Sequence, residues 1–581
     1  MQLQDWIHRI TEGGGDRAMR LLTSLLCFVA LSLAYDLRGY KSLSSQEAMD
    51  TAQLARNIAE GRGYTTLSVR PFDLALMRKA ATNAPPILDQ MMPDISNPPV
   101  YPALVALVFK VGAFRCGSGQ SVAPWDLEPW IMGLNQALFF IAAMLLFKTA
   151  AQLFDKSVAW LASGVFVATD LMWQFSVSGL STMLLLVIFL LIVRGLVRLD
   201  SRINGPIPER RSGVWVCLAI GAIIAIGGLT QYSFAWLLVP VLLFILLTVA
   251  EGRAKLCLAV SLAFLAVMTP WLARNYHLSG NLFGSAGYSV FQSTPGFPSD
   301  TLERSFDPRN GLSRINAGDF ADKLLVNTRN IVSNDLPRLG GNWISAFFLV
   351  GLLVSFRKPI LSKIRFFVLG SVVFLTAIQA MGQTHLTEEN PMLNSENLLI
   401  VFAPMVFVFG AAFYFTLLEQ LDTHSPAVRT ALISVFFAVV CAPFILVFMT
   451  PPSFPPVAFD PYYVQRVVNW TGEDELMISD IPSAVAWYGY QTCAWLPLNS
   501  REEFDILNRI KPVRAIYLTQ RTTANFMSQT SRNPASWERF ALNCWTRGEV
   551  PDQFPLTKAP TGFLPDRVFL SATDRWRSSR K

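Results

Sequence analysis

The sequence predicts an all-α polytopic membrane protein that ends in a small α/β domain. Of its 581 residues, 52% are hydrophobic and only 15% are charged, and the mean hydropathy is +0.38. A soluble protein of this length would be less apolar. About eleven apolar runs, each of about 15–24 residues, are long enough to cross a bilayer or nearly so. After the last run, short strand-like and helix-like segments alternate, as they do in α/β domains.

The membrane spans are expected at apolar runs that follow one another closely. The first run, Leu21–Tyr35, is short enough to resemble a signal peptide, but we expect an uncleaved helix because many spans follow it. The others are expected near residues 129–150, 158–174, 177–197, 214–231, 234–250, 256–272, 343–356, 366–382, 397–418 and 429–449. One further run, Val100–Phe114, starts after Asn97-Pro98-Pro99, and its length alone does not decide whether it crosses.

The distribution of Lys and Arg decides this point. The most basic short loop contains Arg194, Arg198, Arg202, Arg210 and Arg211, and such loops are usually cytoplasmic. With a cytoplasmic N-terminus, this loop is cytoplasmic only if Val100–Phe114 does not cross. We therefore expect an interfacial helix there. The net charge of +7 comes largely from such flanking cations, so it indicates topology and not a nucleic-acid partner.

This topology predicts two domains, residues 1–450 in the membrane and residues 451–581 on the outer face. It also predicts three outer loops, at residues 36–128, 273–342 and 383–396, which are called the first, second and third outer loops below. Long loops in a compact protein are usually functional or disordered. We expect function in the first outer loop, where charged residues follow the first span directly.

A short helix is expected at residues 44–60, just after the first span. Ser44 and Glu47 have the spacing of a capping box, and Gly61 supplies a stop. Glu47 and Asp50 then lie about one helical turn apart. The sequence thus places two carboxylates just outside the bilayer.

The C-terminal residues predict a parallel sheet without a nucleotide site. Strands are expected at Leu476–Ile481, Ala494–Leu498 and Ala515–Thr519, and helices at Ser483–Tyr488 and Arg501–Ile510. No glycine-rich phosphate loop accompanies them. We expect this domain to bind an acceptor or a partner. Cys493 and Cys544 lie in it, and the sequence leaves open whether they pair.

Several motifs stand in order within roughly residues 20–450: Glu47–Tyr64, Asn97–Pro102, Ser178–Ser181, Pro270–Asn275 and Asn342-Trp343. Together they resemble the motifs of the GT-C membrane glycosyltransferases, which include protein O-mannosyltransferases and the bacterial aminoarabinose and lipopolysaccharide-core sugar transferases. The chain departs from the family pattern at three places. Glu47 stands where Asp is usual, Gln231 where Arg is common, and Asn397-Leu398 where Arg-Tyr is common.

The resemblance implies transfer of a sugar from a polyprenyl-phosphate donor to an envelope acceptor, with inversion, on the outer face of a bacterial inner membrane. In such a reaction a carboxylate activates the acceptor as general base. Cations or other donors stabilise the phosphate that leaves. The four His show no metal-binding spacing, so no metal site is assigned, although a divalent cation is left open.

We assign Glu47 as the general base, with a purely structural capping role as the alternative. Asp50 and Asp94 are the other catalytic candidates, against a helix-dipole role and a turn role respectively. The candidates for substrate binding are cations and polar residues of the outer loops, each weighed against a role as solvated surface or interfacial anchor: Arg56, Arg62, Arg70, Arg274, His385, Glu388 and Glu389.

Two other functions were weighed. A transporter or flippase of a lipid-linked envelope precursor should carry ionisable residues near the middle of its spans. Here those spans hold almost no central charges, and the carboxylates gather in the first outer loop. The second of these other functions is that of a non-catalytic assembly protein with the GT-C fold. The sequence does not identify the sugar, the acceptor or the length of the carrier.

Overall fold

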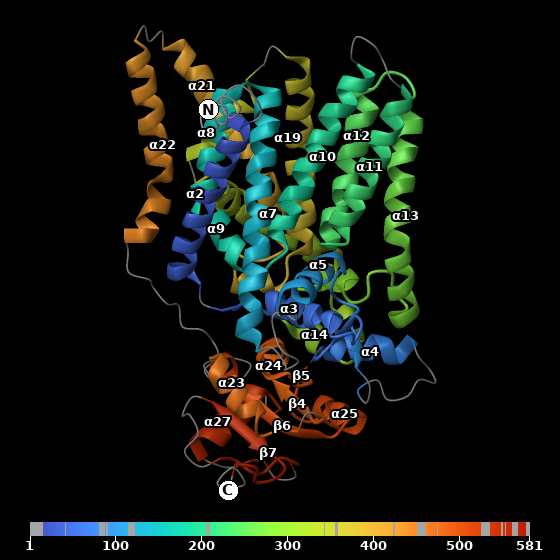
Figure 1. Cartoon of the computed structure of the whole chain (residues 1–581). Coiled ribbons are helices and arrows are strands. Elements are labelled where there is room, and N and C mark those ends of the chain that lie inside the picture. Colours follow the sequence, from blue (N-terminus) through green and yellow to red (C-terminus); the bar gives the residue numbers. More distant parts are fainter. Residues whose placement is uncertain are drawn as a thin grey trace.

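The computed structural model describes most of the chain. The described residues are 15–40, 42–80, 88, 91–113, 123–204, 210–341, 343–354, 358–421, 425–449, 460–472, 474–523, 535–547, 550–551, 554–560 and 567–576. Within them, a bundle of long helices carries short helices and a five-stranded sheet at one end (Figure 1). Phe114, Asn342, residues 355–356 and residues 451–459, which enter the sequence predictions, lie outside the described residues.

Seven helical segments in the described part of the chain are long and apolar enough to cross a membrane. They are α2 (Gly15–Gly39), α7 (Pro124–Leu153), α10 (Thr182–Ile203), α13 (Arg253–Ser279), α19 (Pro359–Gly382), η5 with α21 (Leu398–Phe402 and Ala403–Gln420), and α22 (Pro426–Met449). An eighth is present if α8 (Lys156–Val167) and α9 (Asp170–Val177), bent by 55°, form one span.

By length, therefore, the structure gives fewer than the eleven spans predicted. The other three runs form shorter helices: α11 (Arg210–Gly228), η2 with α12 (Tyr232–Leu237 and Leu238–Thr248), and α18 (Trp343–Gly351). A helix of nine residues such as α18 is only about 14 Å long, roughly half the hydrocarbon thickness of a bilayer. Apolar composition alone did not reveal where these helices begin and end.

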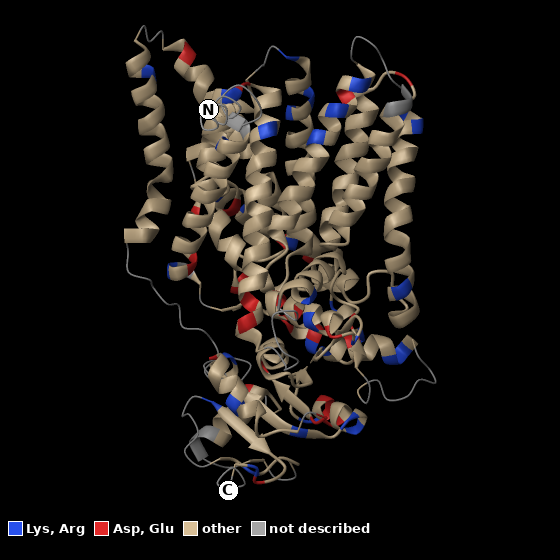
Figure 2. Ribbon diagram, in the orientation of Figure 1, with Lys and Arg blue, Asp and Glu red and all other residues tan. Residues whose placement is uncertain are grey.

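Lys and Arg gather at the end of the bundle opposite the sheet, and α2 begins at that end (Figure 2). Two of these cations tie neighbouring helix ends together. Lys363 of α19 pairs with Asp200 of α10 at 2.6 Å, and Lys358 donates to the carbonyl oxygen of Leu153 at 3.0 Å. The two ends of the bundle therefore differ in charge, as the sequence predicted for its loops.

Short elements of the first outer loop lie at the other end. They are α3 (Gln46–Ala59), α4 (Pro71–Ala80) and α5 (Val100–Val108), which continues into the π-helical turn η1 (Phe109–Ala113). Helix α5 packs against α3 and falls among the apolar helices too short to count as spans. Two short strands, β1 (Thr65–Thr66) and β3 (Met92–Pro93), pair antiparallel beside them.

The predicted helix at residues 44–60 is present as α3, but its cap is not the one expected. Ser45, not Ser44, is the N-cap, and its side chain accepts a hydrogen bond from the Ala48 amide at 3.2 Å. Glu47 is therefore the second residue of the helix and not the N3 residue of a capping box. Its carboxylate is bonded elsewhere.

The five-stranded sheet has the order β2-β5-β4-β6-β7. Strands β5 (Cys493–Trp495), β4 (Leu476–Ser479) and β6 (Val513–Leu518) run parallel, and β7 (Val568–Ser571) is antiparallel to β6. The remaining strand, β2 (Ser68–Val69), comes from the first outer loop and pairs parallel with β5. The sheet is thus not built from C-terminal residues alone. Strand β2 was not predicted because it has only two residues and depends on pairing with a distant segment.

Helix α24 (Pro482–Gly489) joins this sheet to the helices of the membrane part. All its residues from Pro482 to Tyr488 are buried. The hydroxyl of Tyr488 donates to the Leu43 carbonyl at 3.0 Å and to Glu128 of α7 at 2.8 Å, and the indole of Trp487 donates to Glu128 at 3.0 Å. Bonds to a buried charged group are each worth about 1.5–3 kcal/mol, so α24 is firmly docked.

Candidate active site

A cavity of about 670 Å³ lies where α3 meets the outer loops and the ends of the bundle helices. Its wall includes Gln231, Tyr232 and Trp236, which follow the end of α11. The charged residues that line it, among those the structure describes, are Glu47, Arg70, Glu303 and Glu396. Each of the three outer loops contributes at least one of these four residues.

Glu47 faces this cavity from the first turn of α3. Its side chain is partly exposed, and Ser395 of the third outer loop donates to both of its carboxylate oxygens, from the amide at 3.1 Å and from the hydroxyl. Burial raises the pKa of Glu47 most, the Ser395 hydrogen bonds and Arg70 lower it, and the nearby Glu396 carboxylate raises it, and the net result is a pKa of about 7. A carboxyl group with a pKa near 7 is suited to proton transfer at neutral pH.

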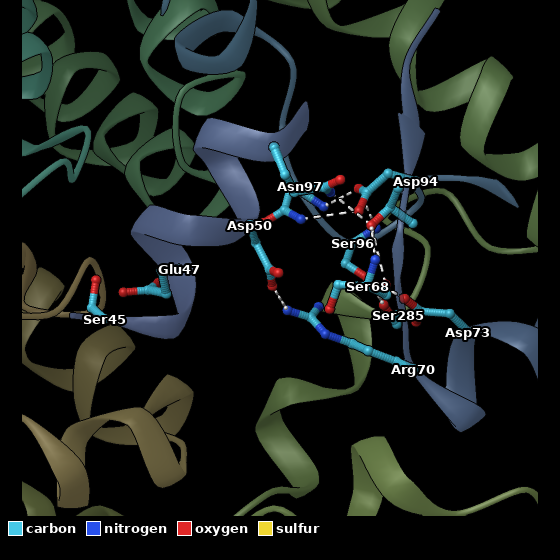
Figure 3. Close-up of polar contacts among 12 residues, drawn as sticks. Ser45, Glu47, Asp50, Ser68, Arg70, Asp73, Asp94, Ser96, Asn97 and Ser285 are labelled. Atoms are coloured by element: carbon cyan, nitrogen blue, oxygen red, sulfur yellow. Dashed lines mark hydrogen bonds and ion pairs between the residues drawn. The ribbon is translucent and has the colours of Figure 1, made fainter. Parts of the chain in front are cut away.

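Asp50 lies one turn further along α3 but does not line the cavity. Its side chain is buried, and Oδ2 forms an ion pair with the Arg70 guanidinium at 2.9 Å (Figure 3). Burial raises the pKa of Asp50, and the charge of Arg70 opposes this. The structure therefore places Asp50 in an ion pair with Arg70, outside the cavity lining, and Glu47 in the cavity lining.

Arg70 follows strand β2 directly and also lines the cavity. Four carboxylates, those of Glu303, Asp50, Asp73 and Asp94, surround it. Their charges raise its pKa above the usual value for arginine although burial opposes this. The guanidinium is consequently charged at any accessible pH.

Asp94 shapes the turn before α5. Its carboxylate accepts hydrogen bonds from the Asn97 amide at 2.7 Å, the Asn97 side chain at 3.0 Å and the Ser96 amide at 3.1 Å (Figure 3). Burial raises its pKa to about 6. The Ser96 hydroxyl in turn donates to Asp73. Asp94 is not among the cavity-lining residues, so its bonds match the turn role that was weighed for it.

Three predicted phosphate contacts lie outside the cavity wall. Arg56 is fully buried and donates to the carbonyls of Ala486 and Trp487 in α24, both at 2.8 Å. Arg62 pairs with its neighbour Glu60 at 3.0 Å.

Arg274 is the third of these. It donates to the carbonyl of Asp94 at 2.9 Å, and its guanidinium lies over Trp271 at 4.5 Å from the ring centre. The structure thus places it as a link between α13 and the first outer loop.

The three predicted residues of the third outer loop do not line the cavity either. His385 is buried, with its ring 5.7 Å from that of Trp495. Glu388 is exposed. Glu389 forms an ion pair with Arg521 of the C-terminal part. His385 and Glu389 therefore connect the third outer loop to the C-terminal part.

No group of three or more His, Cys, Asp or Glu residues within the described part of the chain could hold a metal ion. The described cysteines are all free, and Cys493 and Cys544 do not pair. The carboxylates around the cavity are instead held by hydroxyl and amide donors and by Arg70.

Four residues of the site were missed from the sequence: Gln231, Glu303, Ser395 and Glu396. Gln231 donates to the Ser395 carbonyl, and Glu396 accepts hydrogen bonds from the Thr384 amide at 3.0 Å and the Thr387 hydroxyl at 2.7 Å. One signal was available for Ser395 and Glu396. They directly precede the apolar run that starts at 397, just as Glu47 directly follows the first span.

The chain has the GT-C fold of membrane glycosyltransferases. It is similar to ArnT from Cupriavidus metallidurans bound to undecaprenyl phosphate, with a TM-score of 0.54 and 9% identity over 95% of this chain and 98% of that chain. It is also similar to the Archaeoglobus fulgidus oligosaccharyltransferase AglB in complex with an inhibitory peptide and a dolichol-phosphate, with a TM-score of 0.52 and 11% identity over 91% of this chain and 71% of that chain. No protein-family model and no curated protein sequence matches the chain. At these identities the likeness shows the fold alone.

Proposed function

We propose that this protein is an inverting glycosyltransferase that moves a sugar from a polyprenyl-phosphate donor to an envelope acceptor. The observation that carries the proposal is the presence of two groups in the wall of one cavity. Glu47 is a carboxyl group whose pKa is near 7, and Arg70 is a permanently charged guanidinium, and both line the cavity. These are the groups that such a transfer needs.

In the proposed reaction, Glu47 takes the proton from an acceptor hydroxyl or amine as that atom attacks the anomeric carbon. The bond from the anomeric carbon to the phosphate oxygen breaks at the same time, and its electron pair leaves with the phosphate. Arg70 has five N–H donors, and its bond to Asp50 occupies one of them. The others stabilise the phosphate charge as it develops.

The charge distribution supports an orientation for this chemistry. The basic end of the bundle faces the cytoplasm, and the cavity and the sheet lie on the outer side of a bacterial inner membrane. A donor lipid would then lie in the bilayer with its phosphate at the level of Arg70.

The proposal is tested by mass spectrometry of envelope glycans and lipid-linked sugars with and without the gene. Deletion should leave one glycan a sugar short and raise the amount of the unused donor. Wild-type protein should restore the glycan, whereas Glu47→Gln protein made at the same level should not. Unchanged glycans together with an unchanged donor pool would contradict the proposal.

A further inference from the structure

Glu47 is held by the third outer loop and not by its own helix. Both of its oxygens accept from Ser395, which lies 348 residues away in the sequence. Two donors from one residue fix the plane of a carboxylate as well as its position. The lone pairs that Ser395 does not use remain available to take a proton.

Ser395 is itself held on both sides. Gln231, at the start of η2, donates to its carbonyl oxygen. The next residue, Glu396, accepts from the amide and hydroxyl of Thr384 and from the hydroxyl of Thr387, so the beginning of the loop is bonded to its end. The loop is therefore closed on itself, and Ser395 is presented to Glu47 by a rigid support.

We propose that Ser395 is the positioning residue for Glu47, and that its amide and hydroxyl keep the Glu47 carboxylate ionised and oriented for proton transfer. This inference rests on the proposed function, in which Glu47 is the base. Gln231 supports it by fixing the Ser395 carbonyl.

The charged groups with the largest effect on the pKa of Glu47 are Glu396 and Arg70. Glu396 disfavours the ionised form, and Arg70 favours it. The Ser395 bonds act in the same direction as Arg70 and oppose the larger effect of burial. Two adjacent loop residues, Ser395 and Glu396, therefore act on Glu47 with opposite signs.

The test uses the full-length protein in lipid nanodiscs. The midpoint of Glu47 ionisation is read from the infrared carboxyl band that disappears in Glu47→Gln, and the pH dependence of turnover is measured beside it. Ser395→Ala should raise both midpoints by about one pH unit, since one hydrogen bond to a charged group is lost. Ser395→Thr, which keeps a hydroxyl, should return both midpoints to the wild-type value.

Glu396→Gln is the matched control, because it changes the adjacent residue with little change of shape. It should lower both midpoints, since a neighbouring negative charge is removed. If Ser395→Ala does not fold, Gln231→Met replaces it as the test variant and should raise the midpoints by a smaller amount. An unchanged infrared midpoint in the variant tested would overturn the proposal.

Shifts of the same sign in Ser395→Ala and Glu396→Gln would also overturn it, because they would indicate a general loosening of the loop. If the infrared midpoint moves but the pH dependence of turnover does not, Ser395 does control the ionisation of Glu47, and the proposed role of Ser395 is supported. The same result would overturn the assignment of Glu47 as the general base. The two hypotheses therefore fail in different measurements.

Discussion

In one part of the cavity wall, called the Glu47 wall below, Glu47 is held by the neutral donors of Ser395, whereas in another part, called the Arg70 wall, Arg70 lies among four carboxylates. Neutral donors and burial leave the pKa of Glu47 near 7, so this group changes charge close to neutral pH. The carboxylates around Arg70 raise its pKa, so its charge stays constant. One wall therefore suits proton transfer, and the other suits binding of a phosphate whose charge changes during the reaction.

The largest expected effect is on the Glu47 wall. Glu47→Gln keeps the shape of the side chain but removes the proton acceptor, so turnover should fall by about 10²–10⁴-fold. Steady-state transfer by purified protein checks this, with thermal unfolding to confirm that the variant is folded. Wild-type turnover in a folded Glu47→Gln variant would show that Glu47 is not the general base.

The next largest effect is expected on the Arg70 wall. Arg70→Lys keeps a charge but replaces a planar fork with a point charge, and turnover should fall by up to about a hundredfold. Arg274→Lys is the matched control. The structure places Arg274 on backbone carbonyls outside the cavity, so we expect lower thermal stability and less than about a tenfold change in rate. A larger loss of turnover for Arg274→Lys than for Arg70→Lys would reverse the assignment of the phosphate contact.

A smaller effect is expected from pH alone. A general base must be ionised, and the pKa of Glu47 is about 7, so turnover should fall as the pH drops through this value. Between pH 8 and pH 6 the expected loss is about tenfold, as the ionised fraction decreases. A rate independent of pH over this range would show that no group with a pKa near 7 limits the reaction.

The smallest effect on rate is expected for Asp50→Asn. Asp50 is buried and pairs with Arg70, so removing its charge should cost about 3 kcal/mol of stability or less, because three other carboxylates remain near Arg70. The pH midpoint of turnover should stay near 7, since the Asp50 carboxylate is paired with Arg70 and lies outside the cavity that Glu47 faces. Thermal unfolding and a pH series measure the two effects separately. A change in the pH midpoint of turnover in Asp50→Asn would show that the charge of Asp50 affects the ionisation of Glu47.

Local patterns were sufficient to predict α3 and the two carboxylates near its start. The helix lies within the predicted range 44–60, and the cap is displaced by one residue because Ser44 and Ser45 are both good N-caps. Helical spacing alone did not show that Glu47 and Asp50 face different surroundings. Their difference depends on Ser395 and Arg70, which are brought to them by other segments.

The rest of the site depends on contacts between distant segments. Glu303 and Glu396 belong to different parts of the chain, and each looks like an ordinary polar residue in its own segment. Strand β2 has two residues and is defined only by its pairing with β5. The prediction that residues 451–581 form a separate domain did not include this strand, and Arg70 follows it directly.

The pairing of β2 with β5 has a consequence for the order in which the protein is made. Ser68 and its partner Cys493 are 425 residues apart (493 − 68), so the first strand leaves the ribosome long before its partner. At synthesis rates of about 5–20 residues per second, that interval is roughly 20–85 s. Arg70 lacks its neighbouring strand pair throughout this time. A nascent chain would thus hold Glu47 on α3 before strand β5 fixes the strand that precedes Arg70, and the proposed transfer would begin only after the last part of the chain had been made.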